Sequence, residues 1–157
     1  MVYDSWMKKF KEVVLNQLTQ GVSPHSLALS CALAVALATF PAFGVTTIII
    51  FFTALYLNLN QPIMQALNYA MTPVHLLMLP IFLRIGEWIL GEPPVPINPV
   101  KIVSDFNGDW GLFFSQYGMA ALHAMLAWAL IAPIAGIIIF YSLRPLFERI
   151  QRRYRLR

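Results

Sequence analysis

The chain has 157 residues, of which 59% are hydrophobic and 11% charged, and its formal net charge is +4. Average soluble proteins carry about 25% charged residues, whereas from Val13 to Leu83 this chain has no Asp, Glu, Lys or Arg. A soluble domain of this size needs charged, solvated faces on every element, so the composition excludes an ordinary soluble domain. It predicts a single all-α membrane domain over residues 1–157.

The residues that usually carry chemistry are few and scattered. Cys31 is the single cysteine and lies in an apolar run, so there is no disulfide framework. His25, His75 and His123 lie on separate segments without metal-ligand spacing. Because no nucleophile or acid–base arrangement accompanies them, we expect no enzyme activity, no metal and no cofactor.

The first segment, residues 1–20, has the pattern of an amphipathic helix. Apolar residues recur at steps of three and four between residues 3 and 18, and Lys8, Lys9 and Lys11 lie elsewhere around the wheel. Such a helix is too charged to span a bilayer and fits one lying in the interface. The alternative is a mobile leader, because short isolated helices are marginally stable. The long apolar run that follows argues against a cleaved signal peptide.

The second segment, residues 21–91, begins with a helix start at Ser23-Pro24. The run 24–40 is rich in small residues, which favour close helix packing, and its length of about 25 Å suffices only for a thin crossing. Pro41 and Gly44 then break the helix. The following apolar run, residues 45–57, is short for a full crossing.

A further helix is predicted over 62–90, with a break at Thr72-Pro73 because proline disfavours helical geometry at the residue before it. Two topologies remain open. In the first, runs 24–40 and 45–57 form a hairpin of two crossings, 62–90 is a broken third crossing and 117–142 is the fourth. In the second, the two short-armed hairpins only dip into the membrane and return as re-entrant elements. In both cases we expect about four membrane-embedded helical segments, at least one of them discontinuous.

The last third comprises a connection at 92–116, a membrane span at 117–143 and a basic tail at 144–157. The connection is proline-rich and acidic, whereas both ends of the chain are basic, so the positive-inside rule predicts a multi-pass membrane protein with both termini cytoplasmic. The tail is typical of a surface-lying helix that binds anionic headgroups, and we expect no nucleic acid as partner. The arginines expected at the membrane surface are Arg149, Arg152, Arg153, Arg155 and Arg157.

The candidate ligand site centres on Arg84 and Glu87, which are three residues apart and therefore share one helix face. In one interpretation they mark the outer end of the helix, with Arg84 reaching toward water. In the other, Arg84 holds an anionic headgroup with its planar guanidinium, and Glu87 orients it.

The two proline breaks support the second interpretation, because exposed amides at broken helix ends attract anions. The alternative is a pair of kinks without a ligand. The candidate ligand-binding residues are Arg84, Glu87, His75, Thr72, Pro73, Pro41 and Gly44.

Residues 18–92 resemble the bacterial membrane family known as domain of unknown function 2062. The motifs that carry the resemblance are Gly21-x-Ser23-Pro24, Phe40-Pro41-x-x-Gly44, Asn60-x-Pro62, Thr72-Pro73 and Gly86. The chain departs from the family pattern at the second break, where Asn-Pro is common in the family and this chain has Thr72-Pro73. A role of the asparagine side chain at this position is therefore not carried over to this chain. The resemblance implies work close to lipid-linked phosphates, because some members are fused to glycosyltransferases similar to polyprenyl-phosphate sugar synthases. The paired breaks also resemble those of DedA-type lipid transporters, by architectural analogy.

Two hypotheses follow. In the first, the protein binds or translocates an anionic lipid such as a polyprenyl phosphate, as a homo-oligomer or beside a membrane enzyme. In the second, it is a non-transporting scaffold whose small-residue helix and basic tail recruit an enzyme such as a glycosyltransferase.

Overall fold

The computed structural model describes residues 12, 22–42, 44–96, 98, 104–105 and 108–155. In this part of the chain all regular structure is helical, which confirms the predicted all-α class. The helices are α2 (Pro24–Ala38), α3 (Val45–Tyr56), α4 (Gln61–Ala70), α5 (Thr72–Leu90) and α7 (Trp110–Arg155). The predicted amphipathic helix at 3–18 lies, apart from Glu12, outside the described residues.

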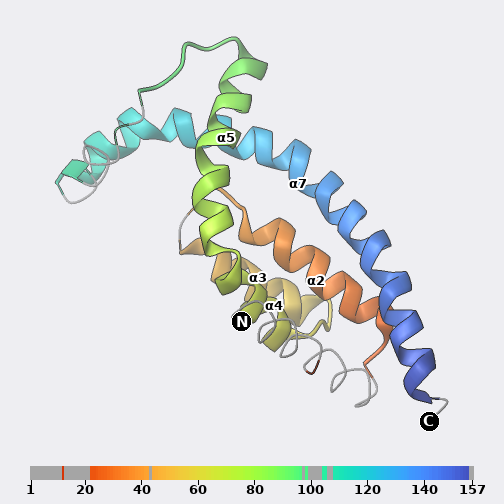
Figure 1. Cartoon of the computed structure of the whole chain (residues 1–157). Coiled ribbons are helices and arrows are strands. Elements are labelled where there is room, and N and C mark those ends of the chain that lie inside the picture. Colours follow the sequence, from red (N-terminus) through yellow and green to blue (C-terminus); the bar gives the residue numbers. More distant parts are fainter. Residues whose placement is uncertain are drawn as a thin grey trace, which may run out of the picture.

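Helices α2 and α7 lie side by side and run in opposite directions along the molecule (Figure 1). Leu27, near the start of α2, shares a core cluster with Phe147, near the end of α7. Farther along, a Cβ on Gly136 would meet the Cβ of Ala36 at 3.5 Å, so the two backbones approach closely. The indole nitrogen of Trp128 donates to the carbonyl oxygen of Ala36 at 3.1 Å. The small residues of α2 therefore serve to bring it against α7.

The first break follows the sequence prediction closely. Helix α2 ends at Ala38, and Gly44 begins α3 with a left-handed φ of 78°, a conformation that glycine adopts without steric cost. Pro41 between them is buried. Helix α3 then turns back along α2. The contact that shows this is the backbone N–H of Asn60, just after α3, which donates to the hydroxyl of Ser30 at 3.0 Å.

The second break lies at Met71, one residue earlier than the predicted position at Thr72. Thr72 is already the first residue of α5, with Pro73 in its first turn. Proline is tolerated there because the N–H that it lacks would have no partner within the helix. The N–H of His75 donates to the carbonyl of Met71 at 2.8 Å and so closes the first turn of α5.

Helix α5 crosses α7 (Figure 1), with residues 82–86 of α5 against residues 123–127 of α7. Phe82 of α5 packs with Ala124 and Ala127 of α7 in a core cluster. One turn farther on, Gly86 lies directly on the backbone of His123, where a Cβ would overlap the carbonyl group. The crossing is thus close enough that only glycine fits at position 86.

The basic segment at the C-terminus is not the separate surface-lying helix that the sequence suggested. Residues 144–155 continue α7 without interruption. The apolar positions 140, 143, 147 and 150 follow one another at helical steps of three and four, so they extend the buried face of α7 onto the start of α2. Helix α7 also begins earlier than predicted, at Trp110 instead of residue 117, and the preceding connection is correspondingly shorter.

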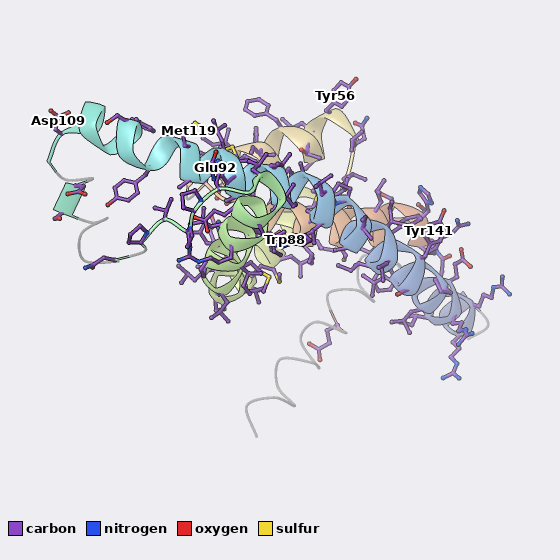
Figure 2. The ribbon with its side chains drawn as sticks, turned by 90° about the horizontal axis from the view of Figure 1, so that it is seen from above. Tyr56, Trp88, Glu92, Asp109, Met119 and Tyr141 are labelled. Atoms are coloured by element: carbon purple, nitrogen blue, oxygen red, sulfur yellow. The ribbon has the colours of Figure 1, made fainter. Side chains whose placement is uncertain are left out.

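Two helical segments, Thr72–Leu90 and Tyr117–Arg153, are long and apolar enough to cross a membrane. In the most apolar window of each, only 22% of the residues are buried, whereas a core helix of a soluble protein is mostly buried. Large apolar side chains cover the outside of the molecule, as Tyr56 and Tyr141 illustrate in Figure 2. The exposed fractions reach 86% for Tyr56 and 81% for Trp88.

Candidate functional site

Arg84 and Glu87 form the predicted pair in the last turns of α5. The guanidinium Nη1 of Arg84 lies 2.8 Å from Oε2 of Glu87. The two side chains differ in burial, since Glu87 is 3% exposed and Arg84 45%. A buried carboxylate thus anchors a cation that still reaches the surface.

The pair also fastens the connection that leaves α5. Oε1 of Glu87 accepts the backbone N–H of Val95 at 2.8 Å, and Nη2 of Arg84 donates to the Val95 carbonyl at 3.1 Å. Because its neighbours Pro93, Pro94 and Pro96 lack an N–H, Val95 is the only backbone donor between residues 93 and 96. Both polar groups of its backbone are held by one ion pair. We call Arg84, Glu87 and Val95 the clasp.

His123 and Gly86 belong to the same place, and the sequence interpretation did not connect them with it. His123 is 6% exposed, and its Nδ1 has no hydrogen-bond partner among the described residues. It lies near enough to Glu87 for a Coulombic interaction, as the contact between Gly86 and His123 requires. No spacing pattern could have revealed this neighbour, because His123 comes from another helix. The only hint in the sequence was Gly86, which directly precedes the predicted site residue Glu87 and so could allow another helix to approach closely.

The other predicted site residues lie elsewhere. Thr72 and Pro73 are exposed at the start of α5, and His75 is buried one turn later. Along α5, Arg84 lies about 20 Å from the break at Met71, at 1.5 Å per residue. The structure therefore brings Arg84 and Glu87 together but keeps them apart from the second break.

The two breaks border the same part of the core. Ala38, the last residue of α2, is a buried member of one core cluster, and Met71 packs against that cluster. Pro41 is buried next to this end of α2, whereas Gly44 is exposed. The predicted residues thus fall into two groups, the clasp at the outer end of α5 and the two breaks at its inner end.

A polar cluster that the sequence interpretation missed lies beside the breaks. The amide nitrogen of Asn68 donates to the hydroxyl of Thr47 at 3.1 Å, and that of Gln65 donates to the carbonyl of Thr47, also at 3.1 Å. Asn68 is 6% exposed. The signal was available, because Gln65 and Asn68 are three residues apart in the middle of a mostly apolar helix and so share a face. We call Thr47, Gln65 and Asn68 the polar cluster.

The described residues hold no group of three or more His, Cys, Asp or Glu side chains that could bind a metal ion. In this part of the chain the clasp supplies charge and hydrogen-bond donors, and the polar cluster supplies uncharged hydrogen-bonding groups.

The fold defines an all-helical protein with two helices of membrane-crossing length and a charged pair at the end of one of them. The family model for uncharacterised proteins conserved in bacteria, DUF2062, matches residues 7–155. The chain belongs to this family, and the match extends over nearly the whole chain, well beyond the residues 18–92 on which the resemblance rested. Comparisons with curated proteins and with solved structures give no match.

Proposed function

We propose that this chain is an integral protein of the bacterial inner membrane that binds an anionic lipid headgroup at Arg84. The observation that carries the proposal is the partly exposed guanidinium, which a buried carboxylate holds at the end of an apolar helix.

The membrane assignment is supported by helix length and by the exposed apolar surface. Helices α5 and α7 meet the length requirement. Large apolar side chains that protein does not cover would be costly in water but suit lipid. The exposed apolar residues of α7 include Leu130, Ile134, Ile137, Ile138 and Tyr141.

We infer that α2 and α3 form a re-entrant hairpin. With 15 and 12 residues, they are about 22 and 18 Å long, too short for a hydrocarbon core of about 30 Å. Helix α2 starts beside Phe147, near the basic end of α7, and ends beside Trp128, close to the middle of the apolar part of α7. Helix α3 then returns to the level of Ser30. In this arrangement α4 and α5 together make one kinked crossing, α7 makes the other, and the basic ends face the cytoplasm.

The clasp has the donors that an anion requires. A guanidinium offers five N–H donors. In the described part of the chain Arg84 uses two of them, one toward Glu87 and one toward Val95. The remaining donors belong to a group that is 45% exposed, so a phosphate can approach without first displacing Glu87.

The surroundings of Arg84 favour a lipid phosphate over a soluble anion. Trp88, Ile89 and Leu90, which follow it along α5, are exposed by 81%, 41% and 50%. Tryptophan and apolar side chains around a cation at a helix end are typical of the level of the lipid headgroups. A polyprenyl phosphate has the required combination of phosphate and long apolar chain.

The test measures retention of a polyprenyl phosphate by the purified protein in native mass spectrometry. We expect Arg84→Gln to weaken retention about tenfold, since a charge-assisted hydrogen bond contributes about 1.5–3 kcal/mol. Arg144→Gln is the matched control, because Arg144 also pairs with a carboxylate, at 3.0 Å, and is also 45% exposed. Equal loss in the two variants, or no loss in either, would contradict a specific site at Arg84.

A second candidate function is a scaffold that recruits a membrane enzyme and transports nothing. The observation that favours it is the basic end of α7, which carries the exposed residues Arg149, Arg152 and Arg153 on a helix that continues to Arg155. Arg157 lies outside the described residues. In this case a triple Arg→Gln variant at positions 149, 152 and 153 would lose the partner in a pull-down from membranes, while Arg84→Gln would retain it.

A further inference from the structure

The polar cluster lies beside the two breaks. Its depth in the membrane follows from the contacts between α7 and the first break. If residues 117–143 span the membrane, as in the proposed function on which this inference rests, the middle of the span is residue 130. Trp128, about 3 Å from that level, contacts the ring of Phe40 at a centroid distance of 4.9 Å. The first break is therefore near the middle of the membrane. Met71, at the second break, packs against the core cluster that contains Ala38, the last residue before the first break.

The orientation of Gln65 is fixed by chemistry. Its amide group reaches the backbone carbonyl of Thr47, which can only accept a hydrogen bond, so the nitrogen must face Thr47. The amide oxygen Oε1 is then directed elsewhere, and it is buried without a hydrogen-bond partner among the described residues. An unsatisfied buried carbonyl oxygen destabilises the fold, so a donor at this position would be bound favourably.

The cluster is uncharged, and so are its surroundings along the chain, since the sequence has no charged residue between Val13 and Leu83. A phosphate at this depth would have no counter-ion, and its desolvation would be expensive. A hydroxyl group is different, because it donates one hydrogen bond, carries no charge and can also accept.

We propose that the polar cluster binds the hydroxyl group of a lipid headgroup in the interior of the membrane, with Gln65 Oε1 as acceptor. The ligand class is a lipid with a free, uncharged hydroxyl, and the cluster is a second site, distinct from the anion site at Arg84. Gly44 and Val45, three and two residues before Thr47, are exposed, so the surface next to the cluster is not covered by protein.

The first experiment uses the wild-type protein in detergent and compares two probe lipids, a diacylglycerol and its O-methyl ether. In the ether a methyl group replaces the hydroxyl hydrogen, so the lipid can no longer donate a hydrogen bond. Binding is measured by native mass spectrometry. We expect the diacylglycerol to bind about tenfold more tightly, since the ether leaves Gln65 Oε1 without a donor. Equal binding of both lipids would overturn the proposal, and so would a failure of either lipid to bind.

The second experiment locates the site with variants. Gln65→Met keeps the length of the side chain but removes the acceptor, and should abolish the preference for the alcohol. Thr53→Val is the control, because the Thr53 hydroxyl lies on the same helix as Thr47 but donates to its own helix, at the Ile49 carbonyl. A preference that survives Gln65→Met would overturn the assignment.

Arg84→Gln separates this proposal from the anion site. It should leave diacylglycerol binding unchanged, whereas Gln65→Met should leave polyprenyl phosphate retention unchanged. Failure of one site therefore does not imply failure of the other.

Discussion

Glu87 determines how the outer end of α5 is held. Its two oxygens serve different partners, the guanidinium of Arg84 and the backbone N–H of Val95, and its burial makes both necessary. Removing one partner of a buried charge leaves an uncompensated group, which costs more than losing a pair in water. The clasp therefore stabilises the molecule whether or not Arg84 also holds a ligand.

Replacing Glu87 by alanine should lower the free energy of unfolding by about 2–3 kcal/mol, since two hydrogen bonds to a buried carboxylate are lost. Cys31 offers a direct measurement, because it is the single cysteine and is 3% exposed in the folded protein. The temperature at which its thiol becomes reactive reports unfolding.

Glu148→Ala is the control for this prediction. Glu148 also pairs with an arginine, at 3.0 Å, but it is 38% exposed, and exposed pairs contribute about 0–1 kcal/mol. If the two variants shift the unfolding temperature equally, the clasp has no special role in stability.

At the level of whole elements, the crossing of α5 and α7 depends on Gly86, which has no side chain. Gly86 lies on the carbonyl group of His123, and backbone cannot move aside as a flexible side chain can. Phe82, Ala124 and Ala127 pack around this contact and hold the helices in register. Any larger residue at position 86 must push the helices apart and open this cluster.

Gly86→Ala should therefore destabilise the protein by about 1–3 kcal/mol or more, the usual cost of overpacking. Gly118→Ala on α7 is the opposite case, because its Cβ would meet nothing within 4 Å. Alanine should there raise the free energy of unfolding by up to about 1 kcal/mol through helix propensity. Unfolding followed through Cys31 compares the two, and a Gly86→Ala protein as stable as the wild type would refute the close crossing.

The starts and stops of the helices could be predicted from the sequence because they depend on neighbouring residues. Ser23 and Asn60 cap α2 and α4 with hydrogen bonds of 3.1 Å each, as Ser-Pro and Asn-x-Pro suggested. The extension of α7 through residues 144–155 was missed, because its charges dominated the pattern and concealed Phe147 as a core residue. Contacts between distant segments, such as Gly86 with His123, leave no trace in local spacing.

For the whole molecule, the open question between two topologies becomes a measurable one. In a re-entrant hairpin the bend between α2 and α3 lies inside the membrane, whereas in two full crossings it emerges on the outer side. Val45 is the best position to distinguish them, because it is 42% exposed and lies directly after the bend.

We expect Val45→Cys, in a Cys31→Ala background, to resist a membrane-impermeant thiol reagent added from either side in intact cells or inverted vesicles. Glu92→Cys, in the exposed connection, should react from the outside, and Tyr56→Cys, at the exposed end of α3, from the cytoplasmic side. Reaction of Val45→Cys from the outside would establish two full crossings and contradict the proposed hairpin.

At the same scale, the sequence was sufficient for the helical class, the family and the pairing of Arg84 with Glu87. It did not predict that the clasp and the breaks form two separate places, about 20 Å apart along α5. That separation depends on α5 continuing through Pro80, which lies inside the helix. The sequence predicts a kink at this proline, and the structure shows that the helix is not interrupted there.

Because the clasp holds Val95, the connection between α5 and α7 has two parts, which differ in how easily residues can be inserted or deleted. Between α5 and Pro96, a gain or loss of one residue would misplace Val95, the only backbone donor between residues 93 and 96, relative to the clasp. Beyond Pro96 the clasp imposes no such register, and each doubling of a flexible connection costs only about 0.6 kcal/mol. New sequence, including a whole added domain, is therefore best accommodated after Pro96, where it leaves the crossing of the two long helices undisturbed.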